Sequence, residues 1–221
     1  MILGPLLARW HFSVLTLAFI EGLIAALFSI RLERWWLPIQ LFFFPMVVIA
    51  ASFHIDSRFY LIGFFLTGMV FWNAFKRGVP LYLTGGDVIR EIAGRLPECG
   101  FSFIDLGSGL GGVVSRLSEE KPMGRFVGVE SAPFPYLFGK TRCIHLSNCE
   151  MKWGNYEKVD LSGYDYVYAY LSPVPMPMLF EKARREMKKG SLFISNSFSV
   201  PGLEADEVVE AGGKKLHFWK M

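Results

Sequence analysis

The sequence predicts an α/β domain with a mostly parallel sheet and a carboxy-terminal antiparallel hairpin, preceded by transmembrane α-helices. Three observations support this prediction. An apolar strand, Phe101–Leu106, runs directly into a glycine-rich turn and then into a helix, as in the first unit of a parallel sheet. The last residues form two short strand patterns around Gly212 and Gly213, which is typical of a hairpin. The first 79 residues are strongly apolar.

The amino-terminal third holds three long apolar segments. Phe12–Ile30, Trp35–Phe53 and Phe59–Phe75 are 19, 19 and 17 residues long, close to the roughly 20 residues that cross a bilayer as a helix. Short polar breaks separate them. We therefore expect a membrane anchor of about three transmembrane helices over residues 1–79, followed by a catalytic domain over residues 80–221.

Basic residues predict an orientation for these spans. With three spans, one side carries four basic residues and the other carries two: Arg31, Arg34, Lys76 and Arg77 against Arg9 and Arg58. The positive-inside tendency places the first side in the cytoplasm. The expected localisation is thus a multi-pass membrane protein with a cytoplasmic catalytic domain.

An acidic residue and two prolines within the apolar segments keep a second interpretation open. Glu21 lies in the first segment, and an ionisable residue inside a span is a functional candidate. Pro38 and Pro45 interrupt the second segment. A helical cap, or a pair of helices lying at the membrane interface, would also accommodate these residues.

Charge and composition argue against two classes of function. Residues 81–221 carry seventeen basic and seventeen acidic side chains, so we expect no nucleic-acid partner, which would need a clustered basic face. Cys99, Cys143 and Cys149 form no C-x-x-C pair, and the four histidines are scattered along the chain. We therefore expect neither a metal site nor a disulfide scaffold.

The glycine-rich turn predicts a ligand site. Gly107, Gly109 and Gly111 allow backbone dihedrals closed to other residues and let a ligand approach the main chain. By spacing alone, Gly107, Gly109 and Gly112 also fit the dinucleotide pattern G-x-G-x-x-G. Asp105 favours a different ligand, because its carboxylate would repel a pyrophosphate and attract the ammonium and sulfonium of S-adenosylmethionine. We therefore expect S-adenosylmethionine as the cofactor.

The next two strands add candidate contacts to an adenosyl group. Arg125–Glu130 is a second strand, and Glu130 at its end is placed to accept both ribose hydroxyls. A helix is expected from about Pro135 to Leu146. Within Met151–Lys158, a third strand would bring Asn155 to the adenine amino group, although an Asn-Gly neighbourhood is also ordinary turn chemistry.

A proline-rich loop follows the fourth predicted strand, Tyr164–Leu171. Ligands of open α/β sheets bind beyond the carboxyl ends of the strands, so this loop would lie beside the transferable group. Ser172 and Pro173 are therefore candidate residues for positioning an acceptor through a hydroxyl and a backbone carbonyl. The alternative is a proline-stiffened turn before a helix over Met178–Lys188.

These motifs make the chain from Leu81 to Met221 resemble a class I S-adenosylmethionine-dependent methyltransferase, which has a Rossmann-like sheet. Within that superfamily it resembles small membrane-anchored protein-lysine methyltransferases related to the enzyme that modifies the ATP synthase c subunit. The likeness rests on the D-x-G-S-G-x-G loop, Asp105–Gly111, on a P-x-x-x-T-like approach, Pro80–Thr84, and on the proline-bearing loop. It implies that Thr84 and Ser108 also contact the cofactor.

The resemblance implies methylation of a protein lysine at the cytoplasmic membrane face. A lysine acceptor must be neutral, and an aromatic pocket lined by Tyr82, Tyr156 or Tyr170 would lower its pKa by desolvation. The relatives commonly carry Asp where Leu110 and Asn155 stand here. Three alternatives stay open: a lipid or isoprenoid quinone acceptor, a membrane-bound adenosyl sensor or assembly protein without turnover, and an NAD-dependent oxidoreductase. The oligomeric state is not predicted.

Overall fold

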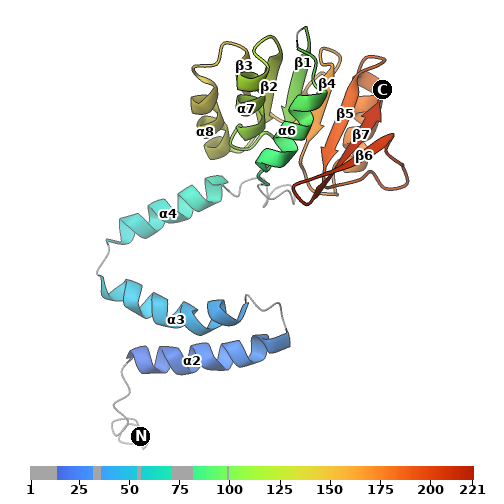
Figure 1. The fold of residues 1–221 in the computed structure, drawn as a ribbon. Coiled ribbons are helices and arrows are strands. Elements are labelled where there is room, and N and C mark those ends of the chain that lie inside the picture. The colour runs from blue at the N-terminus through green and yellow to red at the C-terminus, as the bar shows by residue number, and fades with distance from the viewer. Residues whose placement is uncertain (1–13, 32–35, 54–55, 71–81, 99) are drawn as a thin grey trace, which may run out of the picture. The chain divides into compact units, whose positions relative to one another are not determined.

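The computed structural model describes residues 14–31, 36–53, 56–70, 82–98 and 100–221 (Figure 1). Contacts between residues divide the chain into two compact units, Met1–Gly63 and Phe64–Met221. The predicted domain boundary between residues 79 and 80 stays a prediction.

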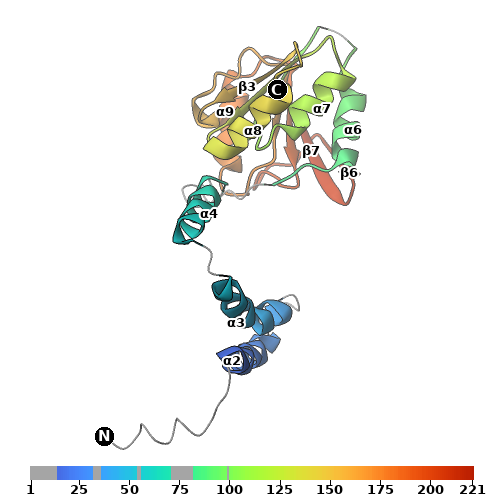
Figure 2. The same ribbon diagram turned by 90° about the vertical axis from the view of Figure 1, so that its left-hand side faces the viewer.

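The first unit is built around a pair of helices, α2 (Val14–Phe28) and α3 (Trp36–Ser52), with a 3-10 turn at Ser29–Arg31 after α2. The two helices lie side by side in both views (Figures 1 and 2). Gly22 permits this close packing, because a β carbon there would lie 2.4 Å from the Leu41 carbonyl oxygen. Both helices expose large apolar side chains to the surroundings of the unit.

The predicted transmembrane spans are wrong. Helices α2 and α3 and the next helix, α4 (Ser57–Val70), contain 15, 17 and 14 residues, fewer than the roughly 20 that a bilayer crossing needs. Within the described ranges, no helix has both the length and the apolar character to span a membrane. This finding overturns the expected multi-pass localisation. Glu21, predicted inside a span, lies exposed on α2, and residues 71–75 of the third predicted segment lie outside the described residues.

A single sheet organises the second unit, in the order β3-β2-β1-β4-β5-β7-β6. Neighbouring strands are parallel from β3 to β5, whereas β7 runs antiparallel to both β5 and β6. The strands are β1 (Ser102–Leu106), β2 (Arg125–Glu130), β3 (Cys149–Trp153), β4 (Tyr166–Ala169), β5 (Leu192–Asn196), β6 (Glu207–Ala211) and β7 (Lys214–Lys220). The predicted mostly parallel sheet is confirmed.

Helices cover both faces of this sheet (Figure 2). The helices α6 (Gly86–Arg95), α7 (Gly112–Glu120) and α8 (Pro133–Cys143) bury apolar side chains in a cluster on one face. Helix α9 (Met176–Glu186) buries Leu179, Phe180 and Ala183 in a second cluster on the other face. Apolar residues recur at helical spacing in these helices, so each helix packs one apolar side against the sheet.

The strand pleat decides which side chains reach the α6–α7 face. In β1, Phe103 packs in the cluster of α6 and α7, whereas Ile104 packs in the cluster of α9. Because successive side chains alternate between faces, Asp105 points to the α6–α7 side together with Phe103. Its register partner in β4, Tyr168, lies on that same face.

The carboxy-terminal hairpin is confirmed at the predicted turn. Gly212 and Gly213 join β6 to β7 and have φ angles of +56° and +72°. Two consecutive positive φ angles define the tight hairpin turn whose twist matches that of its strands, and glycine adopts it without steric cost.

Some element ends differ from their predicted positions. Helix α8 begins at Pro133 and α9 at Met176, each two residues before the predicted start, because proline is well suited to the first turn of a helix. The third strand begins earlier, at Cys149, and ends at Trp153. Tyr156–Lys158 forms a 3-10 turn instead of continuing the strand.

The packing of α8 on the glycine-rich turn gives a first prediction. A β carbon on Gly139 of α8 would lie 3.2 Å from the Gly111 nitrogen and 2.8 Å from the Met151 methyl carbon. We expect Gly139→Ala to lower the free energy of unfolding by about 1–3 kcal/mol, the usual cost of overpacking. Denaturant unfolding measures this change.

The matched control is Gly94→Ala. Gly94 lies within α6, and no atom lies within 4 Å of the β carbon it would gain. Alanine is the better helix former, so this variant should gain up to about 1 kcal/mol. Equal behaviour of the two variants would contradict the proposed close packing of α8.

Candidate functional site

The glycine-rich turn forms a tight loop between β1 and α7. Gly107, Gly109 and Gly111 all have positive φ angles, at +76°, +54° and +69°, which explains the alternate glycines of the motif. The backbone N–H groups of Gly107 and Ser108 both donate to the Val129 carbonyl oxygen, each at 2.9 Å. The loop is therefore tied to the end of β2.

Glu130 holds the same loop from the side of β2. One carboxylate oxygen accepts the Gly109 N–H at 2.9 Å, and the other accepts the N–H groups of Ser131 and Ala132, each at 2.7 Å. The side chain is 4% exposed, so these bonds compensate the buried charge. This role of Glu130 was not predicted, and its predicted ribose contact stays a prediction.

Asp105 is buried on the α6–α7 face of the sheet, with 2% exposure. Burial raises the pKa of its carboxyl to about 7; the Ser108 hydroxyl acts to lower this pKa, and the charge of Glu130 raises it further. A nearby cation stabilises the ionised form of a buried carboxyl and so offsets the cost of its burial. This environment suits a ligand that carries positive charge.

A buried chain of hydrogen bonds links the sheet to the segment before α6. The Asn196 amide donates to the Tyr168 hydroxyl at 2.9 Å, and a second bond of 2.9 Å joins that hydroxyl to the Thr84 hydroxyl. Burial raises the pKa of Tyr168 far above its ordinary value, so the phenol stays neutral. Tyr168 thus holds Thr84 over the sheet.

Three aromatic rings gather beside Thr84. Tyr82 and Tyr170 stack with ring centroids 4.9 Å apart, and Phe198 lies 5.7 Å from Tyr82 and 6.2 Å from Tyr170. Tyr156, the third tyrosine considered for an aromatic pocket, is instead buried in the cluster on the α9 side. The aromatic wall therefore comes from the segment before α6 and the ends of β4 and β5.

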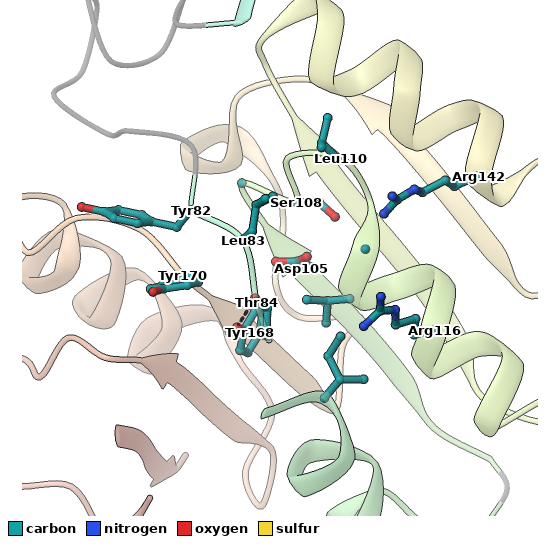
Figure 3. Close-up of a pocket in the computed structure, with 14 residues that line it drawn as sticks. Tyr82, Leu83, Thr84, Asp105, Ser108, Leu110, Arg116, Arg142, Tyr168 and Tyr170 are labelled. Atoms are coloured by element: carbon teal, nitrogen blue, oxygen red, sulfur yellow. Dashed lines mark hydrogen bonds between the residues drawn. The ribbon is translucent and has the colours of Figure 1, made fainter. Parts of the chain in front are cut away.

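These features meet in one pocket (Figure 3). Five of the predicted site residues line it: Thr84, Asp105, Gly107, Ser108 and Tyr170. Its remaining polar lining comes from Tyr82, Arg116, Arg142 and Tyr168. Tyr168 and the two arginines were not predicted as site residues. The strand alternation of Tyr166, Tyr168 and Tyr170 was a signal for the first, whereas only the packing of α7 and α8 brings the arginines to this side.

The other predicted residues do not line the pocket. Gly109 and Gly111 belong to the same loop, and Glu130 binds that loop from behind. Asn155 caps the short 3-10 turn, accepting from the Glu157 N–H and donating to the Glu157 carboxylate. Ser172 and Pro173 form the loop after β4, where Ser172 is buried and Pro173 is exposed. The structure does not bring Asn155 together with the pocket residues.

Two buried serines have unmet hydrogen-bonding capacity. The hydroxyls of Ser108 and Ser172 are inaccessible to solvent and form no hydrogen bond of good geometry to any described residue. Buried polar groups are normally paired, so such a hydroxyl indicates a place where a polar ligand can bind. Together with the loop glycines and the Asp105 carboxyl, Ser108 fits a polar, positively charged ligand such as the methionine portion of S-adenosylmethionine. In the described part of the chain, no three His, Cys, Asp or Glu side chains gather as metal ligands.

Comparisons with known proteins agree with this geometry. An RNA methyltransferase from Salinibacter ruber, solved with S-adenosyl-L-homocysteine, has a TM-score of 0.58 at 23% identity, covering 63% of this chain and 93% of that chain. A precorrin-6y C5,15-methyltransferase from Geobacter metallireducens has a TM-score of 0.51 at 16% identity, covering 63% and 90%. At these identities the likeness establishes the fold. A search of curated proteins finds no match.

The fold and the glycine-loop site define a class I S-adenosylmethionine-dependent methyltransferase. S-adenosylmethionine is its methyl donor. Residues 105–207, a little under half of the chain, match the family model of the ANTKMT methyltransferase domain. The predicted class and cofactor are therefore confirmed, and the alternative of an NAD-dependent oxidoreductase is set aside.

The raised pKa of Asp105 predicts a pH dependence of cofactor binding. The carboxylate attracts a cation only when ionised, and with a pKa of about 7 the ionised fraction rises about tenfold from pH 6 to pH 8. We expect the Kd for S-adenosylmethionine to fall by about that factor over this range, as measured by calorimetry. Asp105→Asn should bind more weakly with a flat pH profile. An unchanged profile in this variant would assign the dependence to another group.

The bonds of Tyr168 predict a linked loss of stability and binding. Tyr168→Phe leaves the Asn196 amide buried without an acceptor and releases Thr84, so the free energy of unfolding should fall by about 1–3 kcal/mol. The affinity for S-adenosylhomocysteine should fall as well. Tyr166→Phe on the same strand is the control, and we expect it to change neither quantity. A Tyr168→Phe protein of parental stability would contradict the buried bonding.

Proposed function

We propose that the protein transfers a methyl group from S-adenosylmethionine to the side-chain nitrogen of a lysine in a protein substrate. The match of residues 105–207 to the ANTKMT family model supports this proposal, because it suggests protein lysine methylation. The aromatic wall of Tyr82, Tyr170 and Phe198 beside the pocket is the structural observation that carries it.

The chemistry of the acceptor explains why an aromatic wall suits it. When bound, S-adenosylmethionine supplies a methyl group on a positively charged sulfur. A lysine ammonium has no lone pair, so it must lose a proton before it accepts a methyl group. Partial desolvation against aromatic rings lowers the pKa of an amine. Tyr82 and Tyr170 would therefore favour the neutral, reactive lysine, and their ring faces would also guide its alkyl chain.

Ser172 supports the same placement of the acceptor. It lies in the loop after β4, at the carboxyl ends of the parallel strands, where ligands of open α/β sheets bind. Its hydroxyl is buried and has no partner of good geometry in the described residues. We propose that Ser172, together with the Pro173 backbone carbonyl, positions the lysine nitrogen by hydrogen bonding. In-line methyl transfer depends mainly on such alignment.

Labelling with tritiated S-adenosylmethionine tests the acceptor class. Purified enzyme is added to an extract, which is then separated into protein and lipid fractions, and the labelled protein is hydrolysed to amino acids. We expect label in methylated lysine. Label in the lipid fraction would replace the proposal with a lipid or quinone acceptor, and cofactor binding without any labelled product would indicate a sensor. Asp105→Ala and Glu130→Ala serve as inactive controls, because both should lose cofactor binding.

A substitution at Ser172 separates acceptor positioning from cofactor binding. Ser172→Ala removes a buried hydroxyl that has no described partner, so we expect little change in stability. We expect the rate of lysine methylation to fall about tenfold or more, while the affinity for S-adenosylhomocysteine is retained. Methylation at the parental rate would leave Ser172 without a role in the reaction and favour the simple proline-stiffened turn.

A further inference from the structure

Two arginines line the pocket on the side away from the aromatic rings. Arg116 comes from α7 and Arg142 from the end of α8, and both side chains point toward the space beside Leu110 and Asp105 (Figure 3). The Arg142 guanidinium also lies over the Phe138 ring, 5.0 Å from its centroid. No ion pair joins either arginine to an acid among the residues described. Their charge is therefore available to a ligand.

The two guanidinium groups lie at the starts of two helices. A β carbon on Gly112, the first residue of α7, would be 3.2 Å from an Arg142 terminal nitrogen. A β carbon on Gly86, the first residue of α6, would be 3.8 Å from an Arg116 terminal nitrogen. Glycine at both N-cap positions leaves the first-turn N–H groups without a side-chain cap. The first turn of α7 holds no acidic residue, so the partial positive charge of its start adds to that of the arginines, whereas Asp87 lies in the first turn of α6.

A buried hydroxyl independently indicates a ligand at this place. Ser108 precedes α7 in the glycine loop and lines the pocket. It is 8% exposed, and its oxygen has no hydrogen-bond partner of good geometry in the described residues. A hydroxyl can donate to an anion that the two guanidinium groups attract. The two guanidinium groups and this buried hydroxyl therefore line one pocket and suit an anion.

We infer that Arg116 and Arg142 bind the carboxylate of the methionine portion of S-adenosylmethionine. That portion carries an ammonium and a carboxylate on one carbon, and the pocket offers both complements: Asp105 for the ammonium and the arginines for the carboxylate. Arginine is suited to this task because its planar fork matches a carboxylate. The inference concerns the donor, so it does not depend on lysine being the acceptor. A carboxylate on the acceptor would satisfy the same chemistry, and the experiment distinguishes the two sources.

Calorimetry with two ligands tests the assignment. S-adenosylmethionine and its decarboxylated analogue share the sulfonium, the amine and the adenosyl group, and they differ in the carboxylate. We expect Arg116→Gln and Arg142→Gln each to weaken binding of S-adenosylmethionine about tenfold or more, as for loss of a hydrogen bond to a charged group. Binding of the decarboxylated analogue should not weaken. Arg184→Gln, an exposed arginine of α9, is the matched control and should change neither Kd.

Every other result overturns the inference. An equal loss for both ligands would show that the arginines act through the fold or through general electrostatics. Parental affinity for both ligands, with a raised KM for the acceptor alone, would move the arginines to an acceptor carboxylate. Parental values throughout would leave them without a role in binding. Because the decarboxylated analogue reports on the integrity of the pocket, a partly unfolded variant cannot be mistaken for a supporting result.

Discussion

The glycine loop between β1 and α7 depends on the carboxylate of Glu130, and the rest of the site depends on the loop. Three backbone N–H groups donate to this buried carboxylate, one of them from Gly109. Hydrogen bonds to a charged acceptor are among the stronger ones in proteins. They fix the backbone conformation of the loop, whose three glycines with positive φ angles could otherwise adopt many conformations. The start of α7 and the contact with α8 follow from that conformation.

The pocket separates opposite charges by depth. Asp105 is buried on the face of the sheet, and burial raises its pKa to about 7. Arg116 and Arg142 are exposed, and their guanidinium groups lie near the starts of α6 and α7. Burying a charge is costly unless a partner compensates it, whereas an exposed guanidinium stays hydrated until a ligand arrives. The cost carried by Asp105 in the ligand-free protein would be relieved by a cationic ligand, which links the stability of this region to binding.

Much of the local structure could be predicted because it depends on neighbouring residues. The strand, loop and helix around Asp105 follow from an apolar run that meets alternate glycines, and the hairpin at Gly212 and Gly213 follows from turn chemistry. Element ends were less predictable, since the start of α8 depends on how its prolines pack. The predicted membrane spans were wrong because a run of apolar residues gives the length of the apolar segment, whereas the helix within that segment is shorter. Helix α2 gives way to a 3-10 turn at Ser29–Arg31.

The sequence by itself determined the class of the catalytic domain and its methyl donor, since the spacing of Asp105, the glycines and Glu130 encodes the local geometry of the first two strands. Only the tertiary structure decided which side chains share the pocket. Tyr168 reaches Thr84 across 84 positions of the chain, and Arg116 and Arg142 converge from two helices. Such meetings depend on the register of parallel strands and on helix packing. Strand register and helix packing are set by contacts between residues far apart in the sequence, so a local sequence pattern does not predict them.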